Sequence, residues 1–231
     1  MNKGEAISKV NQLASSGEPF LMIADFSLRN NHVYAVSELE QEEVLFEVNG
    51  IRNYTEEPPR DHRFALNKIP VEYSEYLAAF QQVHKEISRG NTYLLNLTFP
   101  TNLATELSLL EVFHQSQARY KLWFKNQFVV FSPETFVKIA KGRISSFPMK
   151  GTIDADLPNA RQRILNDEKE MAEHATIVDL IRNDMSIHAR HVTVDRLRYI
   201  EEIRTNEKHL LQVSSKISGQ LPEDYLNNLG D

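Results

Sequence analysis

The chain has 231 residues, enough for one large domain or two small ones with a substantial core. Its composition, 41% hydrophobic and 25% charged, is typical of folded water-soluble proteins. A net charge of -6 argues against nucleic acid as a partner, and the lack of cysteine excludes disulfides, thiolate metal sites and cysteine nucleophiles.

The N-terminus is polar and shows no apolar segment of the kind found in signal peptides. No apolar run approaches the roughly 20 residues of a membrane-spanning helix. We therefore expect a cytoplasmic protein without a membrane partner.

The first third of the chain predicts one helix and two strands. Residues 6–15 have the pattern of a short helix that ends near Gly17, and residues 20–26 and 32–36 can pair as strands. Residues 49–70 are polar and contain two adjacent prolines, which favours a connecting loop.

A second helix is predicted over residues 72–89, because apolar residues recur at spacings of three and four. Gly90 follows as its C-terminal cap, and residues 93–98 then have the pattern of a strand. The apolar stripe consists of Tyr73, Tyr76, Leu77, Phe80, Val83 and Ile87.

Ser108 and Glu111 form a capping-box pattern that starts a helix reaching to about Gln117. Four short strands are expected next, as an antiparallel meander and not as a βαβ succession. They cover residues 120–124, 128–131, 136–140 and 143–147.

The last third predicts one long helix over residues 158–184, two long strands over 192–203 and 210–218, and the start of another helix at Pro222. Helices and antiparallel strands together indicate the α+β class. We expect a single domain over 1–231, with strands and a loop in 1–70 and a chemically richer core in 71–231.

Lys150 is the first candidate for chemistry. It follows a predicted strand, Gly151 allows close backbone approach to a ligand, and Thr152 adds a hydroxyl group. The segment is either a turn with a solvated lysine or the site of a nucleophilic lysine, which would have to be deprotonated to react.

Glu170 and Glu173 stand three residues apart on the predicted helix, so both carboxylates lie on one face. Such a pair can share a hard cation such as Mg²⁺. Alternatively, the two residues belong to a solvated charged face on which Lys169 pairs with Glu173.

Three other polar positions have a structural and a functional interpretation. Residues 179–184 mix acidic, basic and apolar side chains near the predicted helix end. Glu134 follows Ser132 and Pro133 on a turn whose geometry proline restricts. His209 precedes a strand and is either a structural or a site residue.

Taken in chain order, these segments resemble the motifs of the chorismate-utilising enzymes, a family that includes anthranilate, aminodeoxychorismate, isochorismate and salicylate synthases. The motifs that carry the resemblance are Ser-Pro-Glu-x-Phe at 132–136, Pro-x-Lys-Gly-Thr at 148–152, Asp-x-Lys-Glu-x-x-Glu-His at 167–174, Val-Asp-Leu-x-Arg-Asn-Asp at 178–184, and a late strand with His209, Ser214 and Ser218-Gly219-x-Leu221.

Lysine at position 150 is typical of aminodeoxychorismate synthase component I, whereas the other members carry alanine there. The resemblance implies stacked antiparallel sheets with helices outside, and an enzyme that aminates chorismate for 4-aminobenzoate and folate synthesis. It implies Mg²⁺ on Glu170 and Glu173, Lys150 as nucleophile, Glu134 as acid, His209 near the ring, and a glutamine amidotransferase subunit as the source of ammonia.

Two departures from the family pattern leave alternatives open. Leu94 stands where family members often have a polar residue, which disfavours a water-adding reaction such as that of isochorismate synthase. Family members also continue beyond the Ser-Gly-x-Leu ending, so we expect the chain to lack their C-terminal segment. The alternatives are a catalytically incomplete fragment of the synthase and anthranilate synthase component I.

Overall fold

The computed structural model describes residues 1–55, 67–204 and 208–230. The chain divides into two compact units, the first made of Met1–Glu56 and Ser116–Asp231 and the second of Glu57–Gln115. The prediction of a single domain over 1–231 stays a prediction.

The first unit begins with a helix that packs on a hairpin. Asn2 caps α1 through a reciprocal capping box with Glu5, and Gly17 ends the helix in the left-handed conformation at φ 71°. The helix buries Ala6, Val10 and Leu13 against Val33 and Ala35 of the hairpin. These elements are α1 (Lys3–Ser16), β1 (Phe20–Ile23) and β2 (His32–Ala35), followed by a 3-10 turn at Val36–Glu38.

A four-stranded antiparallel sheet of the same unit has the order β4-β3-β7-β8. Its central strands bury Val44, Phe46, Trp123 and Phe124. The strands are β3 (Val44–Val48), β4 (Ile51–Arg52), β7 (Tyr120–Phe124) and β8 (Phe128–Ser132).

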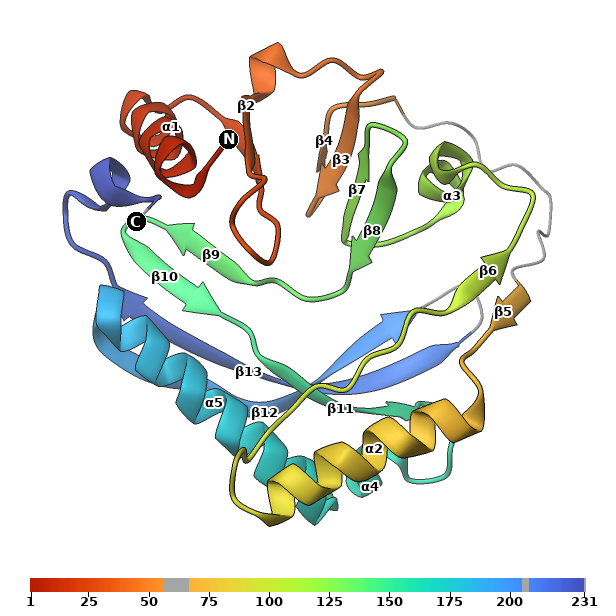
Figure 1. Ribbon diagram of the computed structural model, residues 1–231. Coiled ribbons are helices and arrows are strands. Elements are labelled where there is room, and N and C mark those ends of the chain that lie inside the picture. Colours follow the sequence, from red (N-terminus) through yellow and green to blue (C-terminus); the bar gives the residue numbers. More distant parts are fainter. Residues whose placement is uncertain (56–66, 205–207, 231) are drawn as a thin grey trace. The chain divides into compact units, whose positions relative to one another are not determined.

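The second sheet of this unit is built around β13, which pairs with β12 along one edge and with β10 and β11 along the other. β9 continues the sheet beyond β10 (Figure 1). The strands are β9 (Val137–Ala140), β10 (Arg143–Ser146), β11 (Met149–Asp154), β12 (Arg190–Arg204) and β13 (His209–Gln220).

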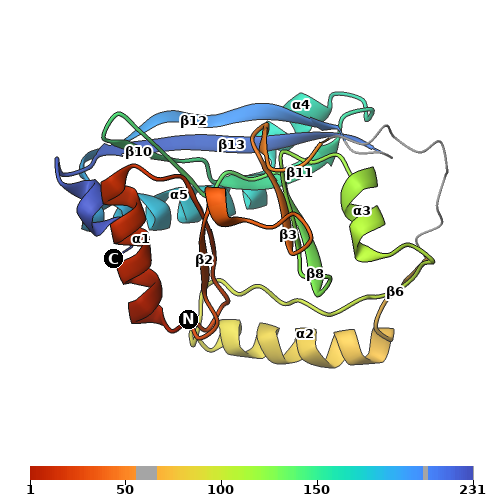
Figure 2. The same cartoon turned by 90° about the horizontal axis from the view of Figure 1, so that it is seen from above.

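Two helices accompany this sheet, α4 (Ala160–Asn166) and α5 (Glu168–His188). Figure 2 shows α5 running alongside the strands, and Val178 and Met185 of α5 pack with Ile217 of β13 in a buried cluster. A short 3-10 helix (Tyr225–Asn228) follows β13. α5 therefore packs on the sheet whose strand β11 carries Lys150.

The second unit contains α2 (Tyr73–Ser88), α3 (Leu109–Gln115) and the antiparallel pair β5 (Asn67–Ile69) and β6 (Asn102–Ala104). The Ser108 hydroxyl accepts a hydrogen bond from the Glu111 amide at 3.2 Å, and Glu111 Oε2 accepts from the Ser108 amide at 2.9 Å. The predicted capping box is thus confirmed.

The α+β class with antiparallel sheets is confirmed, and several predicted elements need correction. Residues 93–98 form no strand, and the four-stranded meander is wrong because β8 and β9 belong to different sheets. Asp167 breaks the predicted long helix by capping α5, since its side chain accepts from the Glu170 amide at 2.9 Å.

Other corrections concern the loop and the C-terminus. Within residues 49–70, β4 and β5 are strands, and residues 56–66 of the predicted loop lie outside the described residues. The helix expected from Pro222 is a single 3-10 turn. Within the described ranges, none of the helices combines the length and apolar character needed to cross a bilayer.

Candidate active site

Glu134 lies where the chain crosses from one sheet to the other, between β8 and β9. Ser132 Oγ accepts from the Glu134 amide at 3.1 Å and donates to the Glu134 carbonyl at 3.2 Å. Tyr120 on β7 hydrogen-bonds to Thr135, which ties the same crossover to the first sheet. Local hydrogen bonds thus hold the turn, as proline restriction at Ser132 predicts.

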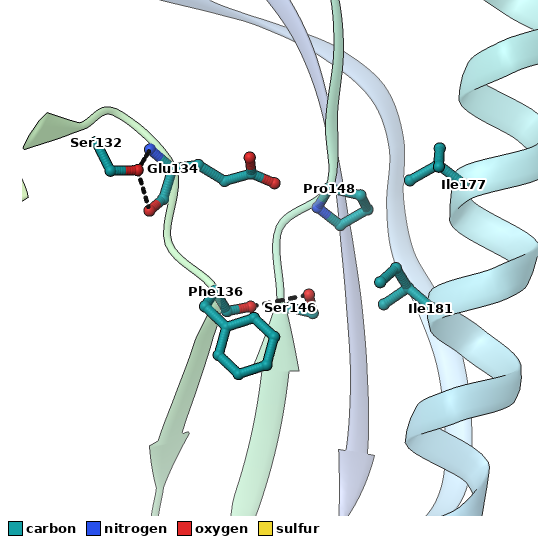
Figure 3. A pocket seen from close by; sticks show the side chains of 7 residues that line it. All are labelled: Ser132, Glu134, Phe136, Ser146, Pro148, Ile177 and Ile181. Atoms are coloured by element: carbon teal, nitrogen blue, oxygen red, sulfur yellow. Dashed lines mark hydrogen bonds between the residues drawn. The ribbon is translucent and has the colours of Figure 1, made fainter. Parts of the chain in front are cut away.

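A cavity of about 260 Å³ opens beside this turn. Figure 3 shows the Glu134 carboxylate extending toward Pro148, with Ile177 and Ile181 of α5 beyond it. The lining residues are Ser132, Glu134, Phe136, Ser146, Pro148, Ile177 and Ile181. The space is mostly apolar, with one carboxyl group aimed into it, a composition typical of small-molecule sites.

The cavity changes the acidity of Glu134. Although the side chain keeps part of its surface exposed, partial burial raises the pKa of its carboxyl group, and a hydrogen bond with the Met149 backbone acts in the opposite direction. A carboxyl group with a raised pKa keeps its proton to higher pH, which suits a proton donor.

Lys150 lies on β11 itself and not in a turn. Its Nζ is 3.6 Å from Glu173 Oε2, and both side chains are only about one-third exposed, at 35% and 30%. Lys169 Nζ lies 3.4 Å from the other oxygen of Glu173. The predicted ion pair between Lys169 and Glu173 on the helix face is therefore present alongside the Lys150–Glu173 pair.

Gly151 allows Glu170 to approach the strand closely. It adopts φ 82°, and a Cβ atom there would lie 3.2 Å from Glu170 Oε2. The ladder with β13 is irregular between Met149 and Thr152, so Lys150 and Gly151 form a local bulge. Thr152 is exposed and opposes Gln212 of β13.

The cavity and the Lys150–Glu173 pair are adjacent. Glu173, Ile177 and Ile181 follow one another at intervals of four on α5, so they share one helix face with a rise of about 6 Å per step. Pro148, on the opposite wall, precedes Lys150 by two residues. Glu134 lines the cavity itself, and the Lys150–Glu173 pair lies one helical turn and two strand residues away from its lining.

Glu170 and Glu173 fit a magnesium ion by their chemistry. Both are carboxylates on one face of α5, exposed to 29% and 30%, and Mg²⁺ is commonly held by one or two carboxylates with water and substrate oxygens completing its shell. Over the ranges that the structure describes, no cluster of three or more metal-binding side chains occurs. Among the described residues, Glu170 and Glu173 would therefore supply the protein ligands of a bound Mg²⁺.

The structure does not bring His209 to these residues. His209 stands at the start of β13, five positions before Ser214, which opposes Met149. Its Nε2 lies 3.4 Å from Glu202 Oε2, and Glu202 also pairs with Arg161 at 2.6 Å. Its role near a reacting ring stays a prediction.

The polar segment 179–184 forms a local exposed pair. Arg182 donates to Asp179 Oδ1 at 2.7 Å, with side-chain exposures of 47% and 61%. This geometry agrees with the interpretation as a solvated turn of helix.

One buried residue near the site had not been singled out from the sequence. His174 follows Glu173, is 1% exposed and lies 2.6 Å from Ser215 Oγ. Burial lowers its pKa, and Arg198 adds to that effect, whereas the Lys150 backbone raises it. Its place within the Asp-x-Lys-Glu-x-x-Glu-His motif was the only signal of a role.

Comparison with known proteins gives the family. The family model described as chorismate binding enzyme matches residues 14–226. An uncharacterized PabA-like protein of Haemophilus influenzae is 43% identical over 225 residues, covering 97% of this chain and 68% of the relative. Another from Pasteurella multocida is 41% identical, covering 97% and 69%.

Solved structures show the same fold at low sequence identity. A putative isochorismate synthase, DhbC from Bacillus anthracis, has a TM-score of 0.57 at 15% identity, covering 97% of this chain and 64% of that one. Anthranilate synthase component I from Streptococcus pneumoniae has a TM-score of 0.54 at 18% identity, covering 90% and 51%. The chain thus spans about half to two thirds of the proteins it resembles here, and it belongs to the chorismate binding enzyme family.

Proposed function

We propose that the chain is component I of an aminodeoxychorismate synthase, which converts chorismate and ammonia to 4-amino-4-deoxychorismate. One observation carries the proposal: Lys150 is held 3.6 Å from Glu173, one helical turn from the cavity that Glu134 enters. A nucleophile needs an acid and an anchored substrate beside it, and Glu134 and the cavity are the groups that could supply them.

The roles follow from the chemistry of each group. The neutral Lys150 amine adds to C2 of the ring, the double bond shifts, and the C4 hydroxyl leaves as water with a proton from Glu134. Ammonia then adds at C4, the double bond returns, and the neutral Lys150 amine is expelled. The new ammonium group at C4 gives one proton back to Glu134, which restores the acid. The raised pKa of Glu134 favours the protonated acid that the first step requires.

Glu170 and Glu173 would hold Mg²⁺, which when bound neutralises the ring carboxylate of chorismate. Glu173 also holds the Lys150 side chain through the ion pair at 3.6 Å, and the ammonium group has to lose a proton before its nitrogen adds to the ring. Gly151 leaves room for Glu170. The apolar wall formed by Pro148, Ile177 and Ile181 excludes water from one side of the ring. A glutamine amidotransferase subunit would supply ammonia; free ammonium can replace it in an assay.

The test compares Lys150→Ala with Lys169→Ala. Both variants remove an ammonium group that pairs with Glu173, but Lys169 is 77% exposed and has no proposed chemical role. With chorismate, Mg²⁺ and ammonium, coupled to a lyase that releases 4-aminobenzoate, Lys150→Ala should lose about 100-fold or more of the rate and Lys169→Ala little.

Three outcomes would contradict the proposal. Amination that survives Lys150→Ala would refute the nucleophile. Fluorescent anthranilate as the product would indicate anthranilate synthase. No product from the unaltered chain, with activity restored by the C-terminal segment of a family member, would show an incomplete synthase.

A further inference from the structure

Arg198 on β12 holds the end of α4 through its side chain. Its guanidinium Nη2 donates to the Leu165 carbonyl at 2.9 Å and to the Ile164 carbonyl at 3.4 Å. Both carbonyls belong to the last turn of α4, where the helix has no further amide of its own to offer. The helix dipole also favours a cation at this end. Arg198 therefore supplies a donor that the last turn of α4 lacks.

The backbone of Arg198 is fixed as well. The pairing of β12 with β13 shifts register between Arg196 and Tyr199, and Arg198 adopts the left-handed conformation at φ 47°. Its amide donates to the hydroxyl group of the fully buried Ser215 at 2.9 Å. A residue other than glycine keeps this conformation only where surrounding contacts impose it. The side chain of Arg198 thus starts from a fixed point on the sheet.

The two carbonyls that Arg198 binds lie directly before the start of α5. Asp167, two residues after Leu165, is the N-cap of α5. Its side chain accepts from the Glu170 amide at 2.9 Å, and its carbonyl accepts from the Met171 amide at 2.9 Å. Anchoring Leu165 therefore restricts where Asp167, and with it the first turn of α5, can lie.

The first turns of α5 carry the carboxylate pair. Glu170 Oε2 lies 3.2 Å from the place of a Cβ atom on Gly151, and Glu173 Oε2 lies 3.6 Å from Lys150 Nζ. Both are close approaches between α5 and β11, so a small displacement of α5 changes both separations. Mg²⁺ demands near-ideal octahedral geometry and tolerates such displacement poorly. The fitness of the pair for a cation thus depends on how firmly the start of α5 is held.

We propose that Arg198 is a positioning residue for the Glu170 and Glu173 carboxylates, acting through the end of α4 and the N-cap of α5. Its guanidinium donates to main-chain carbonyls, so its effect on the pair is transmitted through the backbone. The inference rests on the proposed function for the identity of the cation that the pair holds.

The central test compares Arg198→Met with Arg198→Lys by isothermal titration calorimetry with Mg²⁺. Both variants keep a long unbranched side chain at the strained position, but Met has no donor for the α4 carbonyls, whereas Lys keeps an ammonium group. Arg198→Met should weaken Mg²⁺ binding about tenfold, as for partners that orient metal ligands, and Arg198→Lys should stay within about threefold of the unaltered chain.

The sign of the change separates positioning from two simpler roles. Loss of a nearby positive charge alone would strengthen Mg²⁺ binding, because like charges repel each other. A role in overall stability alone would lower Tm and leave the Mg²⁺ affinity of the folded chain unchanged. Only a role in placing the carboxylates makes Arg198→Met bind Mg²⁺ more weakly and lets Arg198→Lys recover the affinity.

Arg196→Met is the matched control. Arg196 lies two residues away on the same strand, and its guanidinium packs over the Tyr199 ring at 4.2 Å. The variant loses the same charge and leaves the bonds from Arg198 to α4 in place. It should not weaken Mg²⁺ binding.

Hydrogen exchange measured by mass spectrometry tests the anchor without any metal. In Arg198→Met, amide exchange should accelerate in the peptide covering 164–171 and stay unchanged in the peptide covering 143–146. Neither peptide should change in Arg196→Met. If Arg198→Met does not fold, Arg198→Asn takes its place, because asparagine adopts the left-handed conformation more readily and is too short to reach α4.

Equal Mg²⁺ affinity in Arg198→Met and the unaltered chain, or an equal loss in Arg198→Met and Arg196→Met, would overturn the positioning role. Unchanged exchange at 164–171 in Arg198→Met would overturn it as well. If the unaltered chain binds no Mg²⁺, the metal site of the proposed function fails, and exchange at 164–171 still decides whether Arg198 holds the start of α5.

Discussion

Lys150 Nζ and Glu173 Oε2 lie 3.6 Å apart, and the other oxygen of Glu173 faces Lys169 at 3.4 Å. One carboxylate is therefore shared by the proposed nucleophile, by an exposed lysine and by the proposed cation site. A cation bound at Glu173 has to share that charge with both ammonium groups. The shared carboxylate links metal binding to the surroundings of Lys150.

The first prediction concerns this carboxylate pair. Glu173→Gln should weaken Mg²⁺ binding about tenfold or more, because one of two oxygen ligands loses its charge. Isothermal titration calorimetry of the folded chain with Mg²⁺ measures the affinity without any turnover.

Glu168→Gln is the matched control for this experiment. Glu168 is an exposed carboxylate in the first turn of the same helix, so its removal changes the helix charge equally but leaves the pair intact. If Glu168→Gln and Glu173→Gln weakened Mg²⁺ equally, the effect would be one of net charge and the site would lie elsewhere.

The second prediction concerns Glu134, whose pKa burial raises above its ordinary value of 4.5. Below that value the group is protonated in the folded and unfolded states alike. As pH rises through the raised pKa, the folded carboxyl ionises in a partly dry cavity and stability is lost. Glu134→Gln should therefore raise Tm at pH 7.5 relative to the unaltered chain and change it little at pH 4.

The same variant should lower kcat about 100-fold or more, since an amide donates no proton to a leaving hydroxyl. Thermal unfolding at the two pH values and the coupled amination assay measure both effects. A variant with full activity would remove Glu134 from the mechanism whatever its Tm.

Much of the local structure follows from the sequence because local contacts determine it. Asn2 with Glu5 and Ser108 with Glu111 are capping pairs three residues apart, and both are present. Gly17 ends α1 for the same local reason. The motif residues Lys150 and Glu173 are also found together, although the residues around Lys150 alone favoured a solvated lysine.

What the sequence did not predict depends on contacts between distant residues. His174 and Ser215 are 41 positions apart, so their pairing has no local signature. The crossover at Glu134 separates β8 and β9, which the sequence predicted as neighbours in one meander. The alternation of apolar and polar residues identifies a short strand, but it does not indicate which strand it pairs with. The apolar stripe of α2 was predicted correctly as a stripe, yet Tyr73 is 72% exposed, since periodicity does not say what covers a face.

The third prediction uses Gly219, which is buried on β13. A Cβ atom there would lie 2.9 Å from both Ala189 Cβ and Val192 Cγ2, so Gly219→Ala forces the start of β12 to move. We expect a loss of about 1–3 kcal/mol in the free energy of unfolding. Gly4→Ala, in the exposed first turn of α1 with only Asn2 Oδ1 near at 3.5 Å, should be neutral or stabilising by up to about 1 kcal/mol. Urea unfolding measures the free energy of unfolding of both variants. Equal changes in this free energy for the two variants would contradict the crowding at Gly219.

The last prediction concerns Asp195, the centre of a polar cluster on β12. Its Oδ2 accepts from Ser218 at 2.6 Å and pairs with Lys216 at 3.2 Å, while Oδ1 pairs with Arg143 at 3.2 Å. The Ser218 hydrogen bond is the largest cause that lowers the Asp195 pKa, from 3.8 to about 2.

A lowered pKa means that the folded state favours the carboxylate, so its stabilisation is complete above about pH 4 and is lost as pH falls toward 2. Asp195→Asn should lower Tm by about 2–4 °C at pH 7, and the difference from the unaltered chain should shrink between about pH 4 and pH 2. Thermal unfolding across this range provides the measurement. A difference that stayed constant with pH would mean that packing, and not the charge of Asp195, holds this part of β12.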